Sequence, residues 1–342
     1  MIKSGPQKSM NRTGHVHIDD SFRQRGFLPT LDPVTGFPGD SELAMLDKLG
    51  SDLPSLLMDG GFRSYAHSLT LPAWPDTWGG SGFLPLLRLY YLRVGFLASA
   101  YINQVGEPDE KVLPANIARP LVDVCQRLGR PPILSYDGYA LYNWKRFNPD
   151  EPIVLGNIDT LQNFVHLYDE HWFILIHVEI EALAAEVLDA IAVVSGAAPD
   201  QLAGTVNVSL SRIAESVNRQ AGVLRRIPEK MDPALYYRTF RPYIRFFEDV
   251  RYEGVELPPM QFRGETGAQS SIMPLLEAFL KIPHKPSILT SHLSDMRNYM
   301  PQAHRELLQQ VEGMAPVRQL AKADPFNSVL ETIAGFREIH LG

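Results

Sequence analysis

The feature that most constrains this chain is an apolar repeat of helical period in its second half. Between residues 172 and 194, side chains that recur at steps of three and four fall on one face of an α-helix. That face carries Phe173, His177, Ile180, Ala184, Val187, Ile191 and Val194. Similar patterns predict helices at 82–105, 115–128, 133–146, 205–227, 233–249, 272–281 and 327–341. Strand alternation is nearly absent and no βαβ pattern occurs, so the predicted fold class is all-α.

A proline-flanked polar segment divides the predicted helices into two groups. Residues 148–152 read NPDEP, a composition that ends helices and favours turns. This segment is the best linker candidate, and it predicts a small helical domain at 1–152 followed by a larger one at 153–342. The first 25 or so residues are polar and are expected to form a mobile arm.

Composition excludes several classes of function. A net charge of −7 without a long basic run argues against a general nucleic-acid binder, which needs a cationic face. The single cysteine, Cys125, cannot form an internal disulfide, which favours a reducing, cytoplasmic setting. The most apolar stretches, 83–102 and 172–194, both carry charged residues, so neither is expected to cross a membrane. Residues 1–20 lack the apolar core of a secretory signal.

Familiar catalytic motifs are missing. The chain contains no GxGxxG, Walker loop, GxSxG, HExxH or CxxC pattern, and no ExxH pairing of the kind used by helical di-iron bundles. What remains is a small set of polar residues on otherwise apolar helix faces, each of which has a structural and a functional interpretation.

His340 lies on the predicted inward stripe of the last helix, beside Phe336 and Ile333. A buried imidazole needs a partner, because leaving it unpaired costs about 1–3 kcal/mol. One interpretation is a core histidine bonded to a backbone carbonyl. The other is an axial ligand of haem iron, with the porphyrin supplying the remaining coordination.

His177 lies in the middle of its helix on an apolar face, and Glu181 follows one turn later. Glu181 could orient the imidazole, or both side chains could ligate a metal from positions i and i+4. The structural alternative is a pair that faces a neighbouring helix.

Arg241 lies in the segment LYYRTFRPYIRFF, where its spacing from several aromatic residues predicts that it points inward. A buried guanidinium requires a carboxylate, which its planar fork grips in a bidentate manner. The partner could be internal, such as Glu248 or Asp249, or it could be a substrate.

Residues 264–271, GETGAQSS, are small and polar. Such residues let a backbone approach a ligand closely and offer amides and hydroxyls to it. The same composition also suits a simple turn before a helix, with a serine as its cap.

An ordered set of strings gives these residues a common context. KVLPANIARPL, LGRPPILSYDGYALYNW, FILIHVEIEA, RYEGV, RGETGAQSS, SDMRNYMPQAHRELL and FREIHLG follow one another along the chain. Together they closely resemble the indoleamine 2,3-dioxygenase family, whose members share a haem-bearing α-helical fold. The likeness covers roughly residue 26 to the end of the chain and is strongest from Lys111 onward.

The resemblance implies a role for each candidate. His340, in FREIH, matches the proximal ligand of the haem iron, and the expected cofactor is haem b. Arg241 matches the arginine that grips the substrate carboxylate, and His177 lies over the distal face. The positions that match the walls of the distal pocket, or the turn beside haem and the substrate ammonium, are Tyr136, Phe173, Tyr236, Tyr237, Thr266 and Gly267. The small domain is expected to cap the distal side.

Two departures from the family pattern are visible. Animal and fungal members carry serine at the position of His177, whereas an imidazole resembles the sister family of tryptophan 2,3-dioxygenases. His177 is therefore expected to accept a hydrogen bond from the indole N–H, its tautomer held by Glu181, and proton abstraction need not be involved. Family members also continue past the proximal histidine into a lid loop, while this sequence stops at Gly342. Either the tail is absent from this sequence or the protein lacks that lid.

The resemblance implies a dioxygenase that opens the indole ring of L-tryptophan with O2, giving N-formylkynurenine in tryptophan catabolism by the kynurenine pathway. Two alternatives stay open: a related haem enzyme for another indole derivative, and a non-catalytic haem-binding or gas-sensing protein. The expected partners are an indole and O2, without nucleic acid or membrane, and the expected state is a cytoplasmic monomer.

Overall fold

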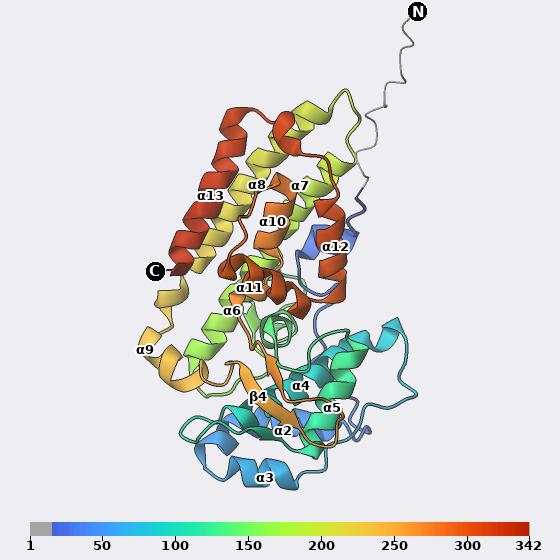
Figure 1. Cartoon of the computed structure of the whole chain (residues 1–342), viewed down its shortest axis with the longest axis vertical. Helices are drawn as coiled ribbons and strands as arrows, with labels where there is room; N and C mark the ends of the chain where they lie inside the picture. Colours follow the sequence, from blue (N-terminus) through green and yellow to red (C-terminus); the bar gives the residue numbers. More distant parts are fainter. Residues whose placement is uncertain (1–15, 342) are drawn as a thin grey trace, which may run out of the picture.

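The computed structural model describes residues 16–341, and helices dominate this part of the chain (Figure 1). The predicted all-α class is confirmed. The α-helices are α1 (Asp20–Arg25), α2 (Ala44–Met58), α3 (Phe62–Ser68), α4 (Leu84–Ile102), α5 (Ala115–Arg127), α6 (Tyr168–Leu183), α7 (Ala185–Ser195), α8 (Leu202–Leu224), α9 (Pro233–Leu235), α10 (Ile272–Leu280), α11 (Ile288–Met296), α12 (Gln302–Glu312) and α13 (Ala323–Leu341).

The strands are short and lie at the margin of this helical body. They are β1 (Val112–Leu113), β2 (Lys145–Arg146), β3 (Ile158–Asp159), β4 (Phe247–Tyr252) and β5 (Met260–Phe262). β4 pairs with β1 in parallel and with β5 in antiparallel fashion, and β2 pairs with β3 antiparallel.

Two predicted helices are wrong, one because side-chain contacts override the helical pattern and the other because a proline interrupts it. The segment 133–146 forms only a short π-helical turn, η2 (Asp137–Leu141). The side chain of Asn143 ends it by bonding both the carbonyl of Tyr139 and the backbone of Gln162. The segment 233–249 forms α9 and a π-helical turn, η4 (Tyr236–Phe240), and then passes into β4. Pro242 stops the helix there, because proline lacks the amide donor that would continue the hydrogen-bond ladder.

The long helix predicted at 172–194 is two helices, α6 and α7, which meet at Ala184. α6 is apolar on nearly every side because it contributes to two separate hydrophobic cores. Ile174 and Val178 lie in the first core, with the early helices, whereas Ile176 and Ile180 lie in the second, with α7, α8 and α10. A helix that is apolar all round is expected at such a buried position. Figure 1 shows α6 between the two groups of helices.

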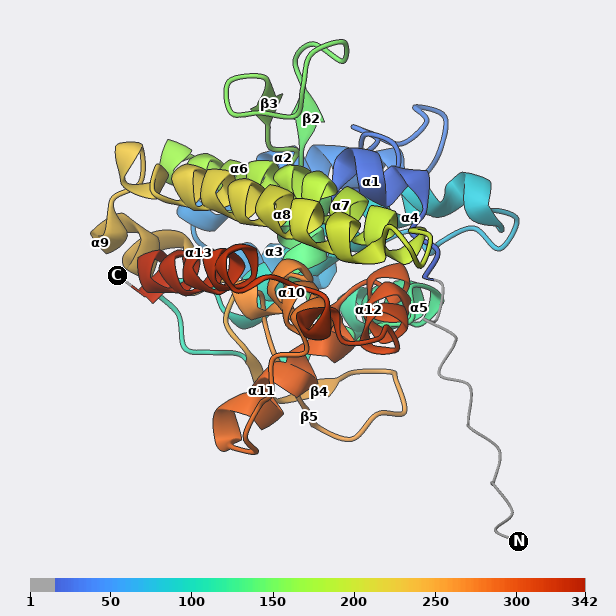
Figure 2. The same ribbon diagram turned by 90° about the horizontal axis from the view of Figure 1, so that it is seen from above.

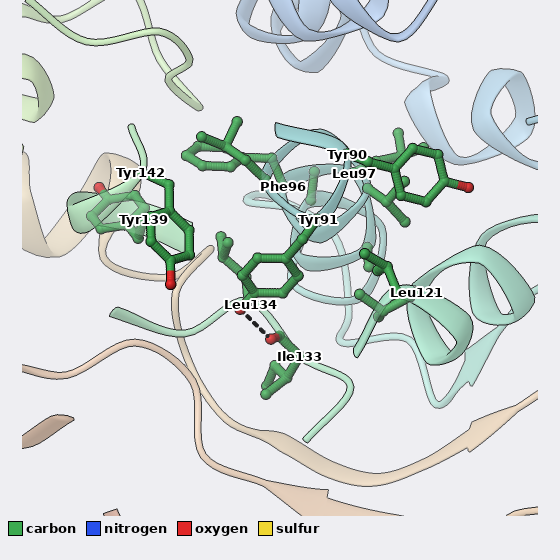
Figure 3. Close-up of a cluster of buried hydrophobic side chains, with 14 of the residues drawn as sticks. Tyr90, Tyr91, Phe96, Leu97, Leu121, Ile133, Leu134, Tyr139 and Tyr142 are labelled. Carbon is green, nitrogen blue, oxygen red and sulfur yellow. Dashed lines mark hydrogen bonds between the residues drawn. The ribbon is translucent and has the colours of Figure 1, made fainter. Parts of the chain in front are cut away.

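The first core surrounds α4, from which Tyr90, Tyr91 and Phe96 project into the interior (Figure 3). The hydroxyl of Tyr91 donates to the carbonyl of Ile133 at 2.9 Å and accepts from the amide of Ser135 at 2.9 Å. These bonds hold the chain just before η2. α4 has the length and apolar content of a membrane span, but 67% of its apolar window is buried within the protein. This burial is typical of a core helix.

The expected mobile arm at the N-terminus can be compared with the structure only from residue 16 onward. Residues 1–15 lie outside the described part of the chain. From Val16 onward the chain is packed, since Val16, Ile18 and Phe27 are buried in the second core. The expectation of a mobile arm to about residue 25 is therefore wrong for residues 16–25, because their apolar side chains pack in the second core.

The predicted linker at 148–152 lies between two paired strands. It belongs to the loop that joins β2 to β3, whose backbones pair antiparallel through Lys145 with Asp159 and Arg146 with Ile158. Figure 2 shows this hairpin projecting from the helical body. The domain boundary near residue 152 stays a prediction.

Candidate functional site

α6 places His177 among aromatic side chains and determines its protonation state. The imidazole is 9% exposed, and its Nδ1 lies 2.7 Å from the carbonyl oxygen of Phe173, one turn earlier. Because a carbonyl only accepts, Nδ1 carries the hydrogen and Nε2 is left with a lone pair. Burial lowers the pKa of His177 to about 4, so the ring is neutral near pH 7.

Glu181 does not hold this tautomer, contrary to expectation. Its Oε1 accepts from the hydroxyl of Tyr136 at 2.8 Å and from that of Ser270 at 2.6 Å. Its Oε2 is buried without a hydrogen-bond partner. Burial raises the pKa of this carboxyl to about 7. The helical spacing correctly predicts that the two residues share a face, but the nearer backbone carbonyl takes the imidazole hydrogen.

Two of the predicted wall residues, Phe173 and Tyr136, contact His177, and a third, Tyr236, packs on Phe173. The ring of Phe173 lies 4.6 Å from the imidazole and 5.2 Å from the ring of Tyr236, measured between centroids. Tyr136 meets His177 edge-on at 5.9 Å. Tyr237 is placed differently, because it is 69% exposed and contacts the edge of Tyr236. Its role beside an indole stays a prediction.

Arg241 follows η4 and is partly buried. Its Nη1 donates to the carbonyl of Ile244 at 3.3 Å, and within the described part of the chain no carboxylate lies within ion-pair distance of it. Neither Glu248 nor Asp249 is therefore its internal partner. Arg241 also borders a surface hollow that includes Glu248 and Lys111.

The segment 264–271 packs between the loop 241–246, which we call the Arg241 loop, and the end of α13. At Gly264 any Cβ would overlap the carbonyl oxygens of Ile244 and Arg245, so glycine is required by the close approach. The side chain of Gln269 donates to the carbonyl of Gly264 at 2.8 Å and accepts from the amide of Tyr136 at 2.8 Å. These contacts fix the loop against the wall of the site.

Gly267 faces His340. A Cβ built on Gly267 would lie 3.4 Å from Cε1 and 3.8 Å from Nε2 of the imidazole. The neighbouring Thr266 accepts from the amide of Ala268 at 3.4 Å and so caps the short helix η5 (Gly267–Gln269). The loop thus brings a residue without a side chain against the imidazole of His340.

His340 lies in the last turn of α13, which runs along α8 (Figure 1). Ile333 on this helix is buried and Phe336 is half-buried, as the stripe predicts, but His340 itself is exposed. Within residues 16–341 its ring has no hydrogen-bond or ion-pair partner, which excludes the core-histidine interpretation. A proton on His340 lowers the pKa of His177, so the two imidazoles lie within electrostatic reach of one another.

These residues fit a haem. In the described part of the chain no group of three or more His, Cys, Asp or Glu side chains could hold a metal ion. A lone imidazole can therefore hold iron only if a macrocycle supplies the other ligands. The ring of His340 has no hydrogen-bond partner among the described residues and is free for that bond, and Gly267 lies against it without a side chain.

The sequence reasoning missed Glu265, which lies between Gly264 and Gly267. Its side chain is 3% exposed and has no hydrogen-bond or ion-pair partner among the described residues. Burial raises the pKa of its carboxyl to about 7, and the charge of Arg241 opposes that rise. A charged residue within a run of small residues is the signal that could have identified it.

The comparisons with known proteins decide the family. The family model of indoleamine 2,3-dioxygenase matches residues 18–342. The chain belongs to this family. Its fold agrees with the helical architecture of the indoleamine 2,3-dioxygenases, and membership makes it an oxidoreductase of the dioxygenase type with haem as cofactor.

The relatives have several names. Indoleamine 2,3-dioxygenase 1 of Rattus norvegicus is 31% identical over 85% of this chain and 74% of its own length. A 6-hydroxytryptophan 2,3-dioxygenase of Fusarium equiseti is 28% identical over 97% of this chain and 84% of its own length. A more distant relative, named myoglobin, from Haliotis madaka, is 26% identical over 86% of this chain and 79% of its own length.

Proposed function

We propose that this indoleamine 2,3-dioxygenase family member cleaves the C2–C3 bond of the indole ring of L-tryptophan, giving N-formylkynurenine for the kynurenine pathway. Bound at His340, haem b would supply the iron that activates O2. The contribution of the chain is to bind the amino acid, orient its ring and keep water away from the reacting bond.

The observation that carries the proposal is the pair of imidazoles. His340 has no partner within the described residues, and His177 lies within its electrostatic reach with Nε2 as an acceptor. An indole N–H is a donor without acceptor capacity, so it complements Nε2. The rings of Phe173 and Tyr236 provide apolar surfaces for the flat ring system.

Arg241 supports an amino-acid substrate. Its guanidinium has no carboxylate partner in the described part of the chain, and buried guanidinium groups are normally paired with one. We assign it the substrate carboxylate. Its position after η4 places it in the same segment as Tyr236, which packs on Phe173.

The experiment is product analysis of the haem-loaded protein with L-tryptophan and with 6-hydroxy-L-tryptophan. We expect N-formylkynurenine from L-tryptophan, with the higher kcat/KM. Preference for the hydroxylated substrate would favour the second candidate, another indole derivative, which is the activity named for the Fusarium equiseti relative.

A non-catalytic haem protein is the third candidate, because one relative carries the name myoglobin. Absorption spectra of the ferrous, CO-treated protein with and without L-tryptophan distinguish this candidate from the proposed dioxygenase. A spectral change on adding L-tryptophan supports a substrate site beside the haem. An unchanged spectrum together with no product would overturn the proposed reaction. We also propose a cytoplasmic monomer, which size-exclusion chromatography with light scattering and cell fractionation would test.

A further inference from the structure

Glu265 and Arg241 are an anion and a cation that do not pair with each other. Glu265 is 3% exposed, and neither side chain has an ion-pair partner within residues 16–341. The two groups nevertheless feel each other electrostatically, because the guanidinium opposes the rise in the pKa of the carboxyl. Burying a carboxylate without a partner is costly, so such a group either takes up a proton or is compensated by a cation.

The surroundings of Glu265 show where that compensation would come from. Gly264, directly before it, packs against the carbonyls of Ile244 and Arg245, and Gly267, two residues after it, faces His340. Gln269 ties the same loop to the amide of Tyr136. The backbone that carries Glu265 therefore lies between the carbonyls of Ile244 and Arg245 on one side and the imidazole of His340 on the other.

Two of the three tyrosines near Glu265, Tyr136 and Tyr236, are predicted wall residues of the site. Its charge raises the pKa of the hydroxyls of Tyr136, Tyr139 and Tyr236, which places the carboxyl near all three. Tyr136 and Tyr139 already donate their hydroxyls to other carboxylates, Glu181 and Glu170. These two tyrosines are therefore not available as donors for Glu265.

We propose that Glu265 is the specificity-determining residue that binds the α-ammonium of the substrate, opposite Arg241. The two separated charges are complementary to an amino-acid zwitterion, in which the ammonium and the carboxylate are both attached to the α-carbon. An ammonium offers three donors, and a carboxylate accepts them as charge-assisted hydrogen bonds. This assignment rests on the proposed function and adds a preference for free amino acids over indoles that lack an amine.

The test compares three ligands on the haem-loaded wild type and on Glu265→Gln, which keeps the side-chain volume. L-tryptophan has both charges, tryptamine lacks the carboxylate and indole-3-propanoate lacks the ammonium. Dissociation constants come from calorimetric or spectral titration. For Glu265→Gln we expect L-tryptophan and tryptamine to bind roughly tenfold or more weakly, while indole-3-propanoate changes by less than about twofold.

The controls separate this inference from the proposed function. Glu265→Gln must retain the haem spectrum and far-ultraviolet circular dichroism of the wild type, and Glu265→Asp should recover part of the affinity for L-tryptophan. Equal weakening of all three ligands, or unchanged binding of L-tryptophan, would overturn the role of Glu265 alone. A haem-loaded wild type that binds none of the three would instead overturn the proposed function.

Discussion

At the scale of single residues, the site consists of polar groups that the polypeptide leaves unpaired. Among the described residues, the lone pair of His177 Nε2 and the ring of His340 have no hydrogen-bond partner, and the guanidinium of Arg241 bonds one carbonyl but no carboxylate. The nearby buried carboxyl of Glu170, in contrast, accepts three hydrogen bonds. Because buried polar groups are normally satisfied, we assign the open positions of His177 and Arg241 to the substrate, and we assign the exposed ring of His340 to the iron.

His340→Ala should abolish stoichiometric haem binding, because the imidazole is the one protein ligand that we assign to the iron. The measurement is the ratio of Soret absorbance to protein absorbance after reconstitution. His67→Ala is the matched control, since His67 is also an exposed histidine in the last turn of a helix, α3. A normal haem spectrum in His340→Ala would refute the assignment.

Arg241→Ala should weaken the binding of L-tryptophan by roughly 10–100-fold, because a charge-assisted bidentate contact is lost. Tryptamine, which has no carboxylate, should be affected by no more than about twofold. Titration of both ligands checks this, with Arg238→Ala as the control, an exposed arginine three residues earlier. If both ligands lose affinity equally, Arg241 has a structural role.

The buried carboxyl of Glu181 should make stability depend on pH. Its pKa is raised from 4.5 to about 7 in the folded protein. The folded state thus holds the proton more tightly, and the stabilisation present below pH 4.5 is lost as the pH rises through about 7. Glu181→Gln should remove up to about 3 kcal/mol of this dependence.

Urea unfolding of the haem-loaded protein at pH 5 to 8 measures this effect. Glu215→Gln, at an exposed position of α8, should follow the wild-type curve. If the free energy of unfolding has the same pH dependence in Glu181→Gln and in the wild type, Glu181 is not the group responsible.

At the scale of elements, the sequence predicts best where apolar periodicity is long and uninterrupted. The predictions for 205–227 and 327–341 correspond to α8 and α13, within a few residues at each end. The failure at 133–146 depends on contacts with distant residues, whereas the failure at 233–249 follows from Pro242, which lies within the segment itself. Asn143, for example, bonds the backbone of Leu161 and Gln162, which no local pattern reveals.

In the site, too, features that depend on local helical geometry are predictable from the sequence, and features that depend on tertiary contacts are not. The α6 pattern correctly places Phe173, His177 and Glu181 on one side, because helical geometry is local. That Nδ1 of His177 bonds its own helix, or that Glu265 lacks a partner, depends on the tertiary surroundings. For that reason the sequence identifies the elements of the site better than it identifies their hydrogen bonds.

Gly267 is where element η5 meets α13, and Gly267→Val should hinder haem binding. A Cβ there already reaches 3.4 Å from the imidazole of His340, so the two added methyl groups would crowd its ring. We expect haem affinity to fall by roughly tenfold, from the cost of overpacking. Gly335→Val is the control, because a Cβ at Gly335 meets nothing within 4 Å. Equal haem affinity in both variants would contradict this contact.

At the scale of the whole molecule, α6 joins two cores that would otherwise be separate. Trp144 is buried in the first core and Trp172 in the second. Because one helix contributes side chains to both, we expect the two cores to unfold in a single cooperative transition. The pairing of β1 with β4, which joins early and late parts of the chain, acts in the same direction.

Fluorescence of two variants tests this expectation. Trp172→Phe reports the first core, and a variant that retains only Trp172 reports the second. In each variant, we expect the urea midpoint of fluorescence to coincide with the midpoint of far-ultraviolet circular dichroism. Separate midpoints in the two variants would show that the cores unfold independently and that α6 does not couple them.

The bond from Nδ1 of His177 to the Phe173 carbonyl also limits what the imidazole can do during turnover. Nδ1 already carries a hydrogen, so a proton taken up at Nε2 would create a buried cation. Nδ1 cannot pass its own hydrogen on, because its partner is a backbone carbonyl, which only accepts a hydrogen bond. The ring nitrogen of the indole should therefore keep its hydrogen while the C2–C3 bond opens. Across a series of fluorinated tryptophans, turnover should then show no acceleration as the acidity of that nitrogen increases.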